Sequence, residues 1–172
     1  PAVFLSYEEY CKETENRMVE ALFVSAGIGA VIAENASIAG ASGGCQAEIG
    51  SASAMAAGGL AYLQGGDAEC IANAAAFALK NMLGLTCDPV CGLVEVPCIK
   101  RNSAGAVNAA VSAQMAMAGI KSAIPADEVV DSMRRIGNAL PAALRETSEG
   151  GLAVTESARK IAERMGKKEH IA

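Results

Sequence analysis

The stretches IGSASAMAAGGLAYLQGG (residues 49–66) and NSAGAVNAAVSAQMAMAGI (residues 102–120) contain no charged residue and consist mostly of Ala, Gly and Ser. Their length without charge raises the question of a membrane. Their Gly, Ser, Asn and Gln content is too polar for a bilayer span, which needs about 20 predominantly apolar residues. We therefore predict that both stretches are buried helices of a soluble protein, with membrane helices as the disfavoured alternative.

The composition of the whole chain agrees with close packing of small side chains. Of its 172 residues 52% are hydrophobic, yet it has only three Phe, three Tyr and no Trp. The length suits one domain with its own core, and no run alternates between apolar and polar residues as a strand would. The predicted fold is all-α: a compact bundle of Gly/Ala-rich helices with cysteine-bearing loops, in a single domain over residues 1–172.

Capping and helix-breaking residues place the remaining elements. Asp67 is a suitable N-cap, Gly84 can end the helix that follows, and Pro125 can open another. Pro89 and Pro97 exclude a long helix between them, so residues 85–100 are predicted to form a loop with at most one short turn. The predicted helices cover residues 7–33, 45–63, 67–83, 101–118, 125–140 and 155–165.

Charge and termini bear on the class of protein. The net charge of −5 and the pI near 5.0 lack the basic face that nucleic-acid binding requires. No basic segment followed by an apolar run marks a secretory signal, so we expect a cytoplasmic protein. The chain opens on Pro1 rather than Met, which suggests a processed or excised piece.

The six cysteines fall into two groups. An even number would suggest disulfides in a small secreted domain, but this chain is neither small nor evidently secreted. Cys70 in an Ala-rich helix is expected to be a small buried side chain, and Cys11 carries no functional signal. Cys91 is ambiguous, either a metal ligand or a packed residue.

Cys45, Cys87 and Cys98 lie in loops or at loop–helix junctions, beside Gly or Pro. Thiolate ligands need such an irregular backbone to wrap a metal centre. Structural zinc prefers four ligands, and His170, the only histidine, is expected to be solvated in the charged tail, which also disfavours Cys-His or Ser-His catalysis. An iron–sulfur cluster with one iron not bound by cysteine fits better, but a structural metal or a metal-free assembly domain stays open.

Three segments carry a family resemblance: NASIAGASGGCQAEIGSASAMAAGGL (35–60), GLTCDPVCGLVEVPCIKRN (84–102) and GLAVTESA (151–158). Together they resemble the α-chain, or catalytic domain, of the iron–sulfur-dependent bacterial L-serine dehydratases, over nearly the whole chain. The resemblance implies that Cys45, Cys87 and Cys98 hold a [4Fe–4S] cluster. It gives Cys91 no ligand role.

The resemblance also implies an activity, the dehydration of L-serine to pyruvate and ammonia in amino-acid catabolism and gluconeogenic supply. The cluster would serve as a Lewis acid toward the hydroxyl leaving group and not as an electron carrier. Related chains extend upstream of the position of Pro1 and work with a β-chain or β-domain in a homo- or hetero-oligomer. We therefore expect a fragment of the α (catalytic) domain that holds its ligands without completing an active site. Its tail, KKEHIA, lacks the terminal cysteine through which some single-chain relatives ligate their own cluster.

Candidate substrate-binding residues flank these cysteines. Asn35, Ser37 and Ser42 could bind the carboxylate or the ammonium of L-serine, or could only shape their loop. Arg101 and Asn102 could pair with a carboxylate or with cluster sulfurs, or could form an exposed helix start.

The acid or base of the reaction is not predicted. Asp88 and Glu48 are acidic residues close to ligands, with surface or capping roles as the alternative. Lys80 and Lys100 give no support to a pyridoxal-phosphate enzyme, whose Schiff-base lysine would sit in a phosphate-binding α/β fold.

Overall fold

The computed structural model describes residues 1–166 and contains no β-strand among them; an isolated parallel bridge joins Cys87 and Arg145. The all-α prediction is therefore confirmed. The α-helices are α1 (Ala2–Cys11), α2 (Glu15–Asn35), α3 (Gly40–Gly43), α4 (Ser51–Leu63), α5 (Ala68–Lys80), α6 (Cys98–Met117), α7 (Ala126–Ala139) and α8 (Glu156–Arg164). A π-helical turn, η1 (Gln46–Gly50), precedes α4, and three 3-10 segments follow later: η2 (Val90–Gly92), η3 (Ala142–Leu144) and η4 (Gly151–Val154).

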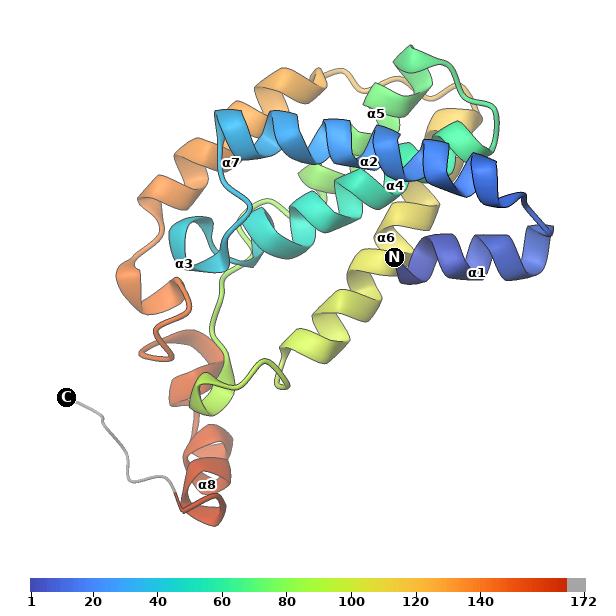
Figure 1. The fold of residues 1–172 in the computed structure, drawn as a ribbon. Coiled ribbons are helices and arrows are strands. Elements are labelled where there is room, and N and C mark those ends of the chain that lie inside the picture. The colour runs from blue at the N-terminus through green and yellow to red at the C-terminus, as the bar shows by residue number, and fades with distance from the viewer. Residues whose placement is uncertain (167–172) are drawn as a thin grey trace.

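Helix α4 lies at the centre and contacts α2, α5 and α6, while α8 is set apart from these helices (Figure 1). The glycines of α4 explain how closely the neighbouring helices approach it. A Cβ on Gly58 would lie 2.2 Å from Cδ1 of Ile28 on α2, and one on Gly59 would lie 2.5 Å from Cζ of Phe4 on α1. The uncharged stretch 49–66 thus forms η1 and the middle helix of the core.

Polar side chains tie α6 to the two helices beside it. Asn108 on α6 donates from Nδ2 to Oγ of Ser53 on α4 and to the carbonyl of Ala78 on α5, each at 2.8 Å. Ser53 in turn donates to the carbonyl of Gly105 at 2.8 Å. Because buried polar groups need partners, these bonds explain why the second uncharged stretch contains Asn and Ser.

Several sequence-based assignments differ from the structure. Residues 7–33 form two helices, because Lys12 adopts a left-handed conformation (φ 55°) and Thr14 caps α2 with a bond from the Arg17 amide. The predicted helix 45–63 begins with a π turn. Helix α6 starts at Cys98, within the segment predicted as a loop.

Asp67 caps α5 as predicted, accepting a hydrogen bond from the Cys70 amide at 2.8 Å. Replacing Asp67 by Ala should lower the free energy of unfolding by about 1 kcal/mol, because the amide loses its acceptor. Chemical denaturation measures the change. Asp67→Asn keeps an acceptor and should cost only a small part of it; an equal loss for both variants would contradict a capping role.

Helix α2 bears on the membrane question. Among residues 1–166 it is the helix whose length and composition would allow it to cross a membrane, with a mean hydropathy of 1.4 over an 18-residue window of which 28% is buried. The core helices of soluble proteins can meet the same criteria. The two stretches that raised the question in the sequence lie in η1, α4 and α6 instead.

Candidate metal centre

Cys45, Cys87 and Cys98 are brought to one region from three separate elements. Cys45 directly precedes η1, Cys87 lies in the segment after α5, and Cys98 is the first residue of α6. Their exposed fractions are 1%, 4% and 6%, and no disulfide joins them. Three buried thiols are thus available as ligands from three parts of the chain.

The backbone around Cys45 depends on Gly44, whose φ is +76°. A Cβ there would lie 2.7 Å from Cδ1 of Leu140 and 2.8 Å from the carbonyl oxygen of Leu85. The same carbonyl accepts the amide hydrogen of Gln46 at 2.9 Å. Glycine therefore allows the Cys45 turn to lie directly against the segment that leads to Cys87.

The carboxylate of Glu48 lies close to two of the thiols. The Sγ atoms of Cys45 and Cys87 and a carboxylate oxygen of Glu48 all lie within 4.8 Å of one another. Cys98 lies outside this group but close enough to interact electrostatically with Cys45. Two of the three predicted ligands, Cys45 and Cys87, are therefore direct neighbours, and Glu48, named from the sequence only as a possible acid, lies beside both.

Burial is the main influence on these thiols. It raises the pKa of Cys87, and the neighbouring Cys45 and the carboxylate of Glu146 add to the effect. Burial also raises the pKa of Cys45, against the opposing influence of Arg101, and that of Cys98. A metal ion bound by these thiols would have to displace their protons, and its positive charge would stabilise the thiolates.

Arg101 and Asp88 form a partly buried ion pair next to the thiols. Nη1 of Arg101 donates to Oδ1 of Asp88 at 2.6 Å and to the Thr86 carbonyl at 2.8 Å, and it lies 3.9 Å from Sγ of Cys45. Burial lowers the pKa of Arg101, but the Asp88 carboxylate outweighs it and the net shift is upward. Arg101 thus stays charged beside Cys45.

Asp88 also holds a distant segment in place. Its side chain is 4% exposed, and Oδ2 accepts the amide hydrogen of Leu152 in η4 at 2.7 Å. A Cβ on Gly151 would lie 2.4 Å from that same oxygen. The role of Asp88 is therefore buried and structural rather than the surface role that the sequence left open, and it explains why the segment GLAV contacts the cysteine loop.

The remaining predicted substrate ligands make local hydrogen bonds. Asn35 donates to Val31 in its own helix at 2.8 Å, and Ser37 bonds to Ser42 at 3.2 Å. Asn102 donates to the carbonyl of Cys98 at 3.0 Å. These bonds agree with the turn and helix-start alternatives and leave a substrate role as a prediction.

Sequence reasoning missed Gln46, which is fully buried. Its Nε2 donates to the Met133 carbonyl on α7 at 3.0 Å, and its Oε1 accepts from the Gly84 amide at 2.9 Å. The side chain links η1 to α7 and to Gly84 in the segment that follows α5. Both partners are backbone groups far away in sequence, so no local pattern could have revealed it.

Glu146 was also missed. Its amide donates to the Cys87 carbonyl at 2.7 Å, and the Cys87 amide donates to Leu144 at 2.9 Å. A Cβ on Gly40 would lie 3.1 Å from Sγ of Cys87, 2.8 Å from a Glu48 carboxylate oxygen and 3.6 Å from one of Glu146. Two exposed carboxylates therefore border the thiols.

The other cysteines and the histidine lie elsewhere. Cys70 on α5 has its Sγ 3.5 Å from Sδ of Met117, and Cys11 is exposed at the end of α1. Cys91 lies in η2 with φ of +59°. His170 falls outside the described residues.

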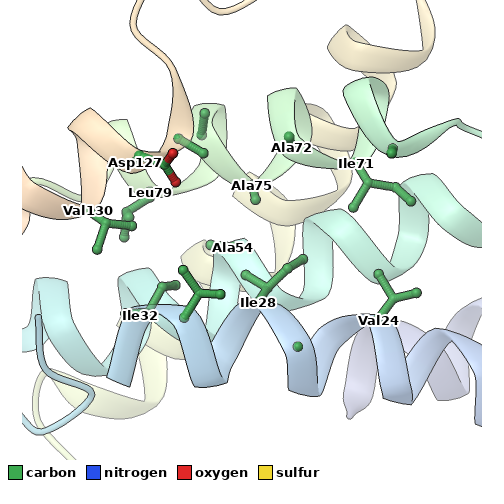
Figure 2. A pocket seen from close by; sticks show the side chains of 15 residues that line it. Val24, Ile28, Ile32, Ala54, Ile71, Ala72, Ala75, Leu79, Asp127 and Val130 are labelled. Atoms are coloured by element: carbon green, nitrogen blue, oxygen red, sulfur yellow. The ribbon is translucent and has the colours of Figure 1, made fainter. Parts of the chain in front are cut away.

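An apolar groove of about 330 Å³ lies between α2, α4, α5 and α7, with Val24 and Ile28 of α2 facing Ala72 and Ala75 of α5 (Figure 2). Apart from Asp127, its lining residues are apolar or Gly. A small zwitterion such as an amino acid would lose its hydration there without gaining hydrogen bonds. The cysteine region is the better candidate site.

Comparison with known proteins identifies the family of the chain. Residues 1–153 match the model of the family described as Serine dehydratase alpha chain. The chain belongs to this family.

Its relatives within the serine dehydratase alpha-chain family are similar over most of its length. It is 53% identical over 165 residues to the probable L-serine dehydratase alpha chain of Bacillus subtilis (96% of this chain, 55% of the relative). It is 47% identical over 161 residues to the L-serine dehydratase alpha chain of Peptoniphilus asaccharolyticus (94% and 55%). It is 45% identical over 156 residues to the L-serine dehydratase TdcG of Escherichia coli (90% and 34%). The chain thus spans about half the length of the alpha chains that it matches.

Proposed function

We propose that this chain provides the cluster-binding part of an L-serine dehydratase, a lyase that converts L-serine to pyruvate and ammonia through a [4Fe–4S] cluster held by Cys45, Cys87 and Cys98. One observation carries the proposal: the three cysteines are buried, and two of them lie together with a carboxylate, in a chain that is 53% identical to a probable L-serine dehydratase alpha chain.

The donor set fits such a cluster. Three thiols leave one iron without a cysteine, and irregular backbone at Gly44 and η2 surrounds two of them. Arg101 adds a charged N–H donor beside Cys45, and hydrogen bonds and charges of this kind tune cluster sulfurs and their ligands. When bound, the cluster supplies a Lewis acid for the departing hydroxide of serine.

The residues of the chain itself would hold and orient the substrate. Glu48 and Glu146 present carboxylates at the exposed edge of the thiol group, where they can attract the ammonium group of serine or accept its α-proton. Asn35, Ser37 and Ser42 remain our candidates for binding the carboxylate or the ammonium group of serine. Arg101 and Asn102 remain candidates for pairing with the carboxylate or with cluster sulfurs. Removal of the α-proton and loss of hydroxide give aminoacrylate, which tautomerises and hydrolyses to pyruvate and ammonia.

The partners belong to the same proposal. We expect a β-chain or β-domain to complete the active site in a homo- or hetero-oligomer within a reducing cytoplasm, where the reaction serves amino-acid catabolism and gluconeogenesis. The acidic net charge of −5 argues against nucleic acid as a partner.

Anaerobic reconstitution with iron and sulfide tests the proposal. The wild type should acquire about four iron and four sulfide per chain, with cluster absorption and EPR spectra, and L-serine should alter those spectra. Cys45→Ser, Cys87→Ser and Cys98→Ser should each lose most of the iron, whereas Cys70→Ser should keep it. A wild-type chain that binds no cluster, or one whose cluster survives all three substitutions, would refute the assignment.

A further inference from the structure

The cysteine region also offers a second set of metal ligands, different from the three cysteines proposed to hold the cluster. Cys45, Cys87 and Glu48 place two sulfurs and one carboxylate oxygen within 4.8 Å of one another, and this set does not include Cys98. Two thiolates and a carboxylate form a common ligand combination for thiophilic divalent cations such as Zn²⁺. We propose that these three residues bind a single divalent cation of this kind, with Zn²⁺ as the type case.

The geometry needs only a small contraction. Zn²⁺ binds thiolate sulfur at about 2.3 Å and carboxylate oxygen at about 2.1 Å, so two donor atoms of a tetrahedral ion lie about 3.5–3.8 Å apart. This separation is roughly 1 Å shorter than the 4.8 Å within which the three donor atoms lie in the structure. Glu48 is exposed, and its side chain can rotate to close this gap. Gly40 helps, because a Cβ there would collide with the Glu48 carboxylate and crowd Sγ of Cys87.

Local charge favours a cation at this position. Glu48 and Glu146 both border the thiols. The nearby guanidinium of Arg101 is paired with Asp88 at 2.6 Å, so its repulsion of a second cation is largely offset. Three protein ligands leave a coordination position for water, as in zinc sites that are not purely structural.

The proposed [4Fe–4S] cluster and the proposed single cation compete, because both would use Cys45 and Cys87 as ligands. They differ in their third ligand, which is Cys98 for the cluster and Glu48 for the single ion. The cation site does not depend on the proposed enzyme activity, although it shares part of the same pocket. A chain that holds Zn²⁺ cannot accept the cluster until the metal leaves.

Substitutions that remove one ligand at a time test the proposal. Zn²⁺ is titrated into the reduced full chain against a chromophoric chelator, and circular dichroism confirms that each variant keeps its helices. The wild type should bind one Zn²⁺ per chain, and Cys45→Ser and Cys87→Ser should abolish binding. Glu48→Gln should weaken binding at least about tenfold, since loss of even an indirect partner of a metal ligand costs about 10–100-fold in affinity. Glu95→Gln, on an exposed residue between Cys87 and Cys98, is the matched control and should leave the affinity unchanged.

Cys98→Ser separates the two sites. It should bind Zn²⁺ within about twofold of the wild type yet fail to assemble the cluster. If Cys98→Ser loses Zn²⁺ while Glu48→Gln keeps it, the three thiols alone bind metal and the proposal is wrong; absence of stoichiometric Zn²⁺ binding by the wild type also overturns it. Failure of cluster assembly in the wild type, with the Zn²⁺ pattern intact, would refute the proposed function and leave the cation site standing.

Discussion

Asp88→Ala is expected to lower the free energy of unfolding by about 3 kcal/mol, the low end of the range for breaking a buried ion pair. The low end applies because the Arg101 side chain is 18% exposed, against 4% for Asp88. The substitution leaves the guanidinium without its partner and the Leu152 amide without its acceptor. Chemical denaturation measures the loss.

The same variant should disturb the thiols, because Asp88 positions Arg101 beside Cys45. We expect faster loss of iron from a reconstituted cluster in Asp88→Ala, measured with an iron chelator under anaerobic conditions. Asp131→Ala removes the exposed carboxylate that pairs with Arg134 and Arg135 on α7, and it should change stability far less. Similar losses from both substitutions would show that burial of the Asp88–Arg101 pair is unimportant.

Met133→Ala should lower the free energy of unfolding by about 2–5 kcal/mol, because it removes a fully buried side chain and leaves a cavity. Met133 is 1% exposed and belongs to the main core cluster that includes Leu79 and Val129. Its carbonyl also accepts the hydrogen bond from Gln46, which links α7 to η1. Chemical denaturation monitored by circular dichroism measures the change.

Met165→Ala is the matched control for Met133→Ala. Met165 follows α8 and is 46% exposed, so its truncation should have little effect. A small change at both positions would mean that α7 can collapse onto the vacated space, and that the packing of α7 against the core is looser than the structure shows.

The sequence predicted the helices whose ends are marked by residues with one clear conformational preference. Asp67, Pro125 and Thr155 begin α5, α7 and α8 as expected. It failed between α1 and α2, because the break lies at Lys12, a residue type with no preference for the left-handed conformation that it adopts. It failed again at the π turn Gln46–Gly50, because no residue type in that segment marks such a turn.

The candidate site was predictable only in part, for a similar reason. The cysteines stood out by residue type and by their Gly and Pro neighbours, and the structure places Cys45 beside Cys87. Glu146 and the contact of Asp88 with Leu152 link positions about 60 residues apart in the chain. Such contacts depend on the path of the chain through space, so residue type and spacing alone do not reveal them.

The contacts that residues 144–152 make with Cys87 and Asp88 impose an order on biosynthesis. The Leu144 carbonyl and the Glu146 amide bond to Cys87, and the Leu152 amide bonds to Asp88, so the cysteine loop stays uncovered until this later segment has left the ribosome. At about 5–20 residues per second, Cys87 and Asp88 lack these partners for several seconds on the nascent chain. The proposed metal could thus be delivered during translation, before residues 144–152 pack against Cys87 and Asp88, and oxidants could reach Cys87 in the same interval.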